Sequence, residues 1–202
     1  SLREAVELAN TTSGAEEIWL PAWDFALTQT GTESTTDNSV NDLDILDETV
    51  IRGMGPGLST IYLGALYNSP SQTNNRLFHL DGSSSILEVS GITAKGGYNY
   101  MGMTGVIAYA NNGASFTLEE SAVVSNMGDG NGVAIRSIDS AVTVRDSVIA
   151  YNSSIGYMSG GIFATSAGGG GTLTIGRSVF LGNESTAGDY GYEDVWIGSG
   201  VT

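Results

Sequence analysis

The chain has 202 residues, of which 41% are hydrophobic and 14% charged, and its formal net charge is −15. This hydrophobic content is too high for a disordered chain, and the acidic balance disfavours nucleic acids and anionic membranes, which need a basic surface. The absence of cysteine excludes disulfides and thiolate metal sites, and no run approaches the ~18 apolar residues of a membrane span.

A short amphipathic helix is predicted at the start of the chain. Apolar residues follow helical spacing at Leu2, Ala5, Val6 and Ala9. Ser1 and Glu4 match a capping box. We expect residues 1–12 to cap the first turn of the structure that follows, and the absence of a signal peptide is typical of a mature or trimmed chain.

Strand-like segments begin directly after this helix. They are irregularly spaced over residues 13–76, where we expect strands at residues 18–20, 25–27, 43–45, 49–51 and 61–63. From residue 77 to residue 202 the pattern becomes regular. A short strand, a corner and a second strand recur at residues 87–94, 116–123, 142–149 and 173–180.

A third strand precedes each of these segments. It occurs at residues 77–79, 106–108, 133–135, 162–164 and 195–197, so that successive starts are 27 to 33 residues apart. One such coil cannot bury its own inner face, but stacked coils bury a continuous core. The sequence therefore predicts a single all-β domain over residues 1–202, a right-handed parallel β-helix with three sides.

Asparagine recurs at one corner of the repeat, at Asn126, Asn152 and Asn183. Stacked amides at this corner would form a hydrogen-bond ladder, and asparagine also tolerates the left-handed backbone of a tight corner. Each residue alone is equally well explained as an ordinary turn asparagine. The register that they share favours the ladder.

The C-terminal end shows no cap in the sequence. After residues 195–197, the segment 198–202 begins a strand that does not finish. Either the chain is cut within a coil, or another molecule covers this end. A second copy stacked head to tail is one candidate for such a cover.

Several motifs resemble the N-terminal part of the CSLREA-domain β-helix proteins. They are SLREAVELAN at residues 1–10, IWLP at 18–21, FALT at 25–28, DLDI at 42–45 and IRGMG at 51–55. The asparagine-ending repeats are similar to the coils that follow in those bacterial secreted and surface proteins, and to polymorphic outer-membrane-protein repeats. The leading cysteine of the family is absent. The resemblance implies a right-handed β-helix on a secreted or surface-anchored protein, and it implies no catalytic residue.

Catalytic groups are sparse in the sequence. A polysaccharide lyase needs a base and a cation that neutralises a uronate carboxylate, and the chain has one lysine, one histidine and six arginines. A glycoside hydrolase needs carboxylates about 5–9.5 Å apart, for which the best trio is Asp129, Asp139 and Asp146. Aspartates are common in turns without any catalytic role.

Metal ligands are similarly few. His79 shares the alternation of apolar residues that we expect to face the core, so we expect a semi-buried structural histidine rather than a base or a metal ligand. The acidic tract 37–48 could gather calcium through carboxylate oxygens, but it lacks the spacing of a dedicated calcium loop. Solvated carboxylates are the favoured interpretation, and no other cofactor is predicted.

Aromatic residues recur in the column of strands that starts at residue 77. The candidate binding residues are Phe78, Tyr109, Phe163 and Trp196, with Arg136 beside them. If they point outward, they form a strip suited to sugar stacking or to a protein contact. If the alternation is reversed, they are core residues, and the sequence leaves both possibilities open.

The sequence therefore predicts a non-catalytic structural and adhesive β-solenoid at the cell surface or outside the cell. Its expected partners are a second copy arranged head to tail, other surface proteins, or polysaccharide. The alternatives are a polysaccharide lyase or glycoside hydrolase, and a glycan-binding module without turnover.

Overall fold

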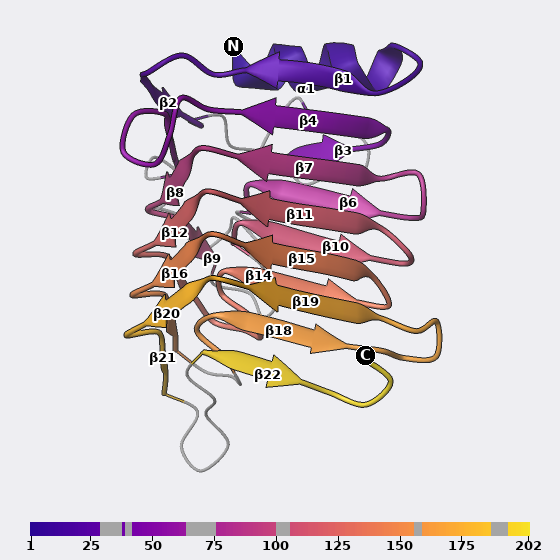
Figure 1. Ribbon diagram of the computed structural model, residues 1–202, viewed down its shortest axis with the longest axis vertical. Helices are drawn as coiled ribbons and strands as arrows, with labels where there is room; N and C mark the ends of the chain where they lie inside the picture. Colours follow the sequence, from indigo (N-terminus) through magenta and orange to yellow (C-terminus); the bar gives the residue numbers. More distant parts are fainter. Residues whose placement is uncertain (29–37, 39–41, 64–75, 100–105, 156–158, 187–193) are drawn as a thin grey trace.

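The computed structural model describes residues 1–28, 38, 42–63, 76–99, 106–155, 159–186 and 194–202. Over these residues the chain forms a β-solenoid of about 5 turns, whose parallel sheets stack around one continuous core. The front strands run to the left and the rear strands to the right as the chain descends (Figure 1), so the solenoid is right-handed. This confirms the predicted fold class.

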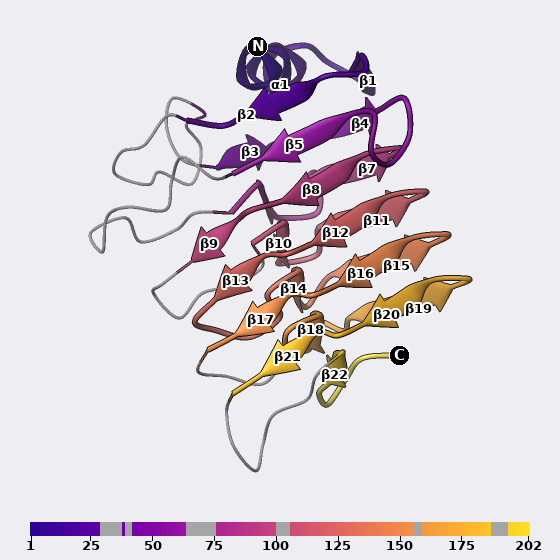
Figure 2. The same ribbon diagram turned by 90° about the vertical axis from the view of Figure 1, so that its left-hand side faces the viewer.

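Helix α1 (Leu2–Thr11) lies across the N-terminal end of the solenoid (Figures 1 and 2). The predicted capping box is present, because the Ser1 hydroxyl accepts from the Glu4 amide and the Glu4 carboxylate accepts from the Ser1 backbone. The apolar side of the helix is buried through Leu2, Val6 and Ala9. These contacts cover the apolar interior of the first coil.

Each full turn passes through sheets A, B, D and C in that order. Sheet A contains β1 (Glu16–Trp19), β4 (Glu48–Arg52), β7 (Ile86–Ser90), β11 (Ser115–Glu119), β15 (Ala141–Arg145) and β19 (Thr172–Gly176). Sheet B contains β2 (Asp24–Ala26), β5 (Thr60–Tyr62), β8 (Thr93–Lys95), β12 (Ala122–Val124), β16 (Val148–Ala150) and β20 (Val179–Leu181).

Sheet C lies behind sheet A in Figure 1. It contains β3 (Leu43–Ile45), β6 (Phe78–Asp81), β10 (Ala108–Asn111), β14 (Ile135–Ile138), β18 (Ile162–Thr165) and β22 (Val195–Ile197). The short sheet D contains β9 (Tyr98–Asn99), β13 (Met127–Gly128), β17 (Ser153–Ser154) and β21 (Glu184–Ser185). The sequence indicated three strands per repeat, and sheet D is a fourth, whose two-residue strands carry too little alternation to be recognised.

Successive coils pair in register, so that like residues stack in columns. In sheet A, for example, Phe116 lies opposite Leu87 on one side and Val142 on the other, and all three are buried. The irregular first coils join the same sheets, since β4 pairs with β7 and β3 pairs with β6. The core is therefore continuous from α1 to the last coil.

The three recurring asparagines form a buried ladder at the corner between sheets B and D. The Asn126 Nδ2 group donates to Asn152 Oδ1 at 2.9 Å, and Asn152 Nδ2 donates to Asn183 Oδ1 at 2.9 Å. The residues just before them, Ser125, Tyr151 and Gly182, have positive φ angles. The corner thus combines a left-handed turn with a column of amides, as the sequence predicted.

Candidate functional site

One column of polar and aromatic side chains follows the outer face of sheet C. Strand pairing places its members on successive rungs, which are about 4.8 Å apart, in the order Asp44, His79, Tyr109, Arg136, Phe163 and Trp196. The alternate positions of the same strands face the core and are fully buried. They include Leu43, Phe78, Ala108, Ile135 and Ile162.

This register corrects two expectations from the sequence. Phe78 is a core residue with 0% exposure and not a binding residue. His79 does not share the inward positions of the apolar residues but belongs to the outer column. The cause of the error is that the residues where these strands begin do not alternate between buried and exposed, since Leu77, Phe78, Val106 and Ile107 are all buried. A shift of one residue in the assumed alternation then exchanges the two faces of the strand.

The N-terminal end of the column is a buried cluster of charged groups. His79 Nδ1 lies 2.9 Å from Asp44 Oδ1. The Arg76 Nε group donates to Asp42 Oδ2 at 2.6 Å. All four side chains are at most 5% exposed, so the charges of Arg76, Asp42 and Asp44 interact with little screening by water.

Tyr109 connects this cluster to the rest of the column. Its ring stacks on the His79 imidazole at a centroid distance of 5.6 Å and an interplanar angle of 3°. The guanidinium carbons of Arg76 and Arg136 lie 5.0 Å and 5.2 Å from the centre of the Tyr109 ring. Cation–π attraction therefore holds both arginines against one tyrosine.

Arg136 is the cation of this column that has no acidic partner among the described residues. Its Nε and Nη1 atoms are buried and make no hydrogen bond. Burial lowers the pKa of the Arg136 guanidinium, Tyr109 raises it, and the neighbouring Arg76 lowers it further. A buried N–H group without an acceptor is costly, so this position favours an anionic group supplied from outside the described chain.

Two stacked aromatic rings complete the column at its C-terminal end. The rings of Phe163 and Trp196 lie 4.4 Å apart at an interplanar angle of 4°. Phe163 is 6% exposed and Trp196 is partly exposed. Of the four candidate binding residues from the sequence, Tyr109, Phe163 and Trp196 therefore lie in one column, and Phe78 does not.

The three candidate catalytic aspartates do not converge. Asp129 follows β13, Asp139 lies between β14 and β15, and Asp146 lies between β15 and β16. The five residues of β15 separate the last two by roughly 17 Å, which exceeds the spacing of a hydrolase pair. The structure therefore gives no support to this trio as a catalytic site.

Asp139 and Asp146 have structural partners instead. Asp139 Oδ1 accepts from the Ser166 hydroxyl at 2.6 Å and from the backbone amides of Ala167 and Gly169 in the next coil. These hydrogen bonds lower the pKa of the Asp139 carboxyl, and the bond from Ser166 has the largest effect. Asp146 pairs with Arg177, which lowers the pKa of the Asp146 carboxyl. Both residues stabilise corners of the solenoid.

The acidic tract 37–48 is described only at residue 38 and from residue 42 onward. Asp42 and Asp44 are 1% exposed and belong to the charged cluster, which corrects the expectation of solvated carboxylates at these two positions. The sequence did carry a signal for this burial. Asp44 interrupts the apolar strand β3 and His79 interrupts the apolar strand β6, at paired positions.

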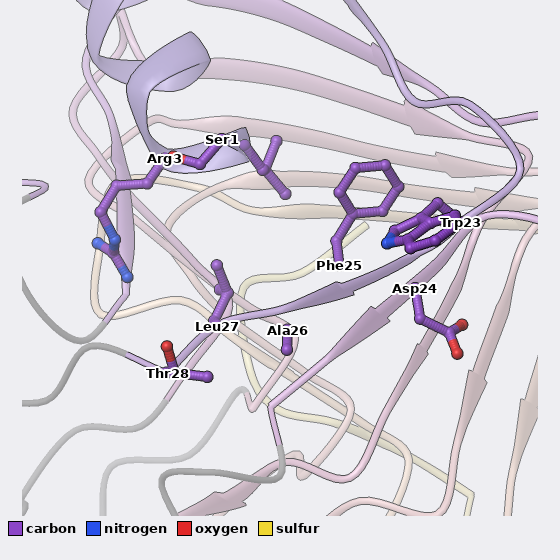
Figure 3. A pocket seen from close by; sticks show the side chains of 9 residues that line it. Ser1, Arg3, Trp23, Asp24, Phe25, Ala26, Leu27 and Thr28 are labelled. Atoms are coloured by element: carbon purple, nitrogen blue, oxygen red, sulfur yellow. The ribbon is translucent and has the colours of Figure 1, made fainter.

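A separate pocket of about 400 Å³ lies between α1 and β2, and Figure 3 shows its lining. Phe25 and Leu27 point toward the helix, and Trp23 lies beside Phe25. The charged residues at the pocket are Asp24 and Arg3, and Arg3 already donates to the Asn38 and Asp42 carbonyl groups. The pocket therefore combines an apolar wall with polar and charged groups.

Comparison with known proteins gives no assignment, since no family model, curated protein or solved structure matches the chain. The likeness to CSLREA-domain proteins thus stays an interpretation of the sequence. Within the described residues, no helix is both long enough and apolar enough to cross a membrane. The outer column of sheet C is accordingly the basis for a functional proposal.

Proposed function

We propose that the chain is a non-catalytic, extracellular adhesive module that binds polysaccharide along the outer face of sheet C. The observation that carries this proposal is the unbroken run of Tyr109, Arg136, Phe163 and Trp196 on successive rungs. Trp196 is partly exposed and offers an apolar ring face to a sugar ring, whereas Tyr109 and Phe163 are 9% and 6% exposed and contribute by packing within the column. A column with regular spacing suits a polymer with a regular repeat better than it suits a small ligand.

Arg136 favours an acidic polysaccharide over a neutral one. Its buried Nε and Nη1 groups lack acceptors, and a uronate carboxylate would supply an acceptor for one of them in a charge-assisted hydrogen bond. The chain as a whole carries a net charge of −15, which repels such a polymer at long range. We therefore expect modest affinity that rises as salt screens this repulsion.

Binding of purified polymers tests the proposal directly. Titrations with polymannuronate, polygalacturonate and a neutral glucan should show binding of at least one polyuronate in preference to the glucan. Trp196→Ala and Arg136→Gln should each weaken that binding by about tenfold or more, since each removes about 1.4 kcal/mol or more of contact energy. The matched control is Trp19→Ala, because Trp19 is 62% exposed on β1 of sheet A.

The outcomes separate the alternatives. Loss of binding in Trp196→Ala with retention in Trp19→Ala supports the sheet C face. Equal loss in both variants, or binding of no polymer, would remove the adhesive role at this face.

A second function, β-eliminative cleavage of a uronate polymer, is favoured by one specific observation. Asp44 contacts the Nδ1 atom of His79, an arrangement that leaves Nε2 as a base. Tyr109 and Arg136 follow on the next two rungs. In such a lyase, His79 Nε2 would take the C5 proton of a uronate, the C4–O bond would break, and the departing oxygen would take a proton from water. The product carries a C4–C5 double bond, so its ultraviolet absorbance should rise with time and should not rise with His79→Gln. A clear signal of this kind would replace the non-catalytic part of the proposal.

Head-to-tail assembly is an independent part of the proposal. The strands β19, β20 and β22 are the last in their sheets, and Ile175, which shares the core-facing column of Val144, is 40% exposed. A second copy stacked there would bury this edge. Sedimentation over a wide concentration range should then show oligomers that Ile175→Lys disperses, and a monomer at all concentrations would remove this part.

A further inference from the structure

We propose that Asp42, Asp44 and His79 form a binding site for a divalent transition metal. Asp42 precedes β3, Asp44 lies within β3, and His79 lies on the neighbouring strand β6. Each side chain offers one ligand atom, and these atoms all lie within 4.8 Å of one another. The three residues are 1%, 1% and 5% exposed. This site does not depend on the glycan-binding proposal.

The spacing of the ligand atoms fits coordination. Bonds from such metals to imidazole nitrogen or carboxylate oxygen are about 2.0–2.2 Å long, and two such bonds at a right angle place their ligand atoms about 3 Å apart. His79 Nδ1 and Asp44 Oδ1 are separated by 2.9 Å. A metal can therefore take both atoms at neighbouring coordination positions without moving either strand.

An unsatisfied oxygen supplies a second, independent observation. Asp44 Oδ2 is buried and has no hydrogen-bond partner among the described residues. Arg76 compensates the Asp42 carboxylate through its bond at 2.6 Å, whereas Asp44 contacts His79, which is uncharged unless it is protonated. A buried carboxylate without full charge compensation is costly, and a divalent cation bound by the Asp44 carboxylate would neutralise its charge.

The backbone that carries the two aspartates is held rigidly in place. Arg3 Nη1 donates to the Asp42 carbonyl at 2.8 Å, and Asn10 Nδ2 donates to the Asp44 carbonyl at 2.7 Å. The Asn38 side chain accepts from the Asp44 amide at 2.6 Å and donates to the Asp44 carbonyl at 3.2 Å. Because α1 and Asn38 fix this segment, its carboxylates lose little freedom when they bind a metal.

The donor set defines the class of metal. One imidazole nitrogen with two carboxylates suits Mn²⁺, Fe²⁺, Co²⁺, Ni²⁺ or Zn²⁺. Calcium and magnesium prefer oxygen ligands alone, and soft metals prefer the thiolates that this chain lacks. We therefore expect Co²⁺ and Zn²⁺ to bind in preference to Ca²⁺.

The site also has a consequence for the imidazole. A metal on Nδ1 leaves the proton of the neutral ring on Nε2. The metal-loaded protein then has no free base at His79, so metal binding and proton abstraction by this residue exclude one another. Added metal should inhibit any lyase activity that depends on His79.

Spectroscopy of the whole chain tests the site without any variant. His79 is the only histidine in the sequence, so its imidazole resonances are unambiguous. After treatment with a chelator, titration with Zn²⁺ should shift these resonances and reach an end point at one metal per chain. Imidazole resonances that do not respond to Zn²⁺ or Co²⁺ would overturn the proposal.

Variants then assign the ligands. Asp44→Asn and His79→Gln should each weaken Co²⁺ binding by more than about tenfold. The matched control is Asp146→Asn, which changes an acidic residue at a corner far from the cluster and should leave Co²⁺ affinity unchanged. If Asp44→Asn and His79→Gln bound Co²⁺ as tightly as Asp146→Asn does, the assignment would be contradicted. Ca²⁺ binding to the unaltered chain as tight as Co²⁺ binding would also contradict it. Circular dichroism of each variant shows whether it is folded, and the Zn²⁺ titration of the unaltered chain decides the question if one is not.

Discussion

Replacing Asn152 with alanine removes the central amide of the corner ladder. Asn152 Oδ1 accepts from the amide nitrogen and Nδ2 of Asn126, at 3.2 Å and 2.9 Å. Its Nδ2 donates to Asn183 Oδ1 at 2.9 Å and to the Val123 carbonyl at 3.1 Å. Asn152 is 0% exposed, so water cannot readily replace these four bonds. At about 1 kcal/mol for each bond, the variant should lose about 4 kcal/mol of unfolding free energy.

Urea unfolding followed by circular dichroism measures this loss. The control is Thr174→Ala, which alters an exposed residue on the outer face of sheet A and should change stability by less than about 0.5 kcal/mol. Hydrogen exchange adds a local measurement, since the Asn126 amide loses its acceptor and should exchange faster. A loss below about 1 kcal/mol in Asn152→Ala would refute the claim that the ladder stabilises the corner.

Three further predictions concern the core, one corner and acid stability. Phe78→Ala should cost about 3–5 kcal/mol in thermal or urea unfolding, because Phe78 is fully buried; a cost below about 1 kcal/mol would contradict the register of sheet C. Gly91→Ala should cost at least about 1–3 kcal/mol, because its φ is +67° and a Cβ would lie 2.6 Å from the Gly53 carbonyl oxygen; unchanged stability would contradict this close approach. Asp139→Asn should destabilise the protein at neutral pH, and the difference should shrink below about pH 4, because the folded-state pKa of Asp139 is lowered. Unfolding curves at several pH values check this sign, and a difference that grows in acid would contradict it.

The repeat and its corner were predictable from the sequence because both depend on local spacing. Asn126, Asn152 and Asn183 recur at the same point of each segment, and a stacked coil brings equal positions together. The capping box at Ser1 likewise needs only residues within one helical turn. Such features require no knowledge of which face of a strand points inward.

Predicting the outer column of sheet C required knowing which face of each strand points inward, and the sequence did not show this. At the start of β6 and just before β10, two successive apolar residues are both buried, Leu77 with Phe78 and Val106 with Ile107. Without alternation, the inward position expected for His79 was wrong, and the orientation of the aromatic set was left open; Phe78 faces the core, whereas Phe163 and Trp196 lie in the outer column. The more reliable signal was a charged residue inside an apolar strand, as at Asp44.

The charged cluster was harder to foresee because its members are distant in the sequence. Asp44 and His79 are separated by 35 residues, and part of the chain between them lies outside the described residues. Only the pairing of β3 with β6 brings them together. The repeat of residues 77–202 gave no reason to align this irregular coil with the regular ones.

The central claim is that the outer face of sheet C is the binding surface, and mapping by nuclear magnetic resonance tests it most directly. Addition of a short oligouronate to the isotope-labelled chain should shift backbone amides of β10, β14, β18 and β22. Shifts confined to sheets A and B, or an unchanged spectrum at saturating concentrations of every uronate tried, would contradict the claim.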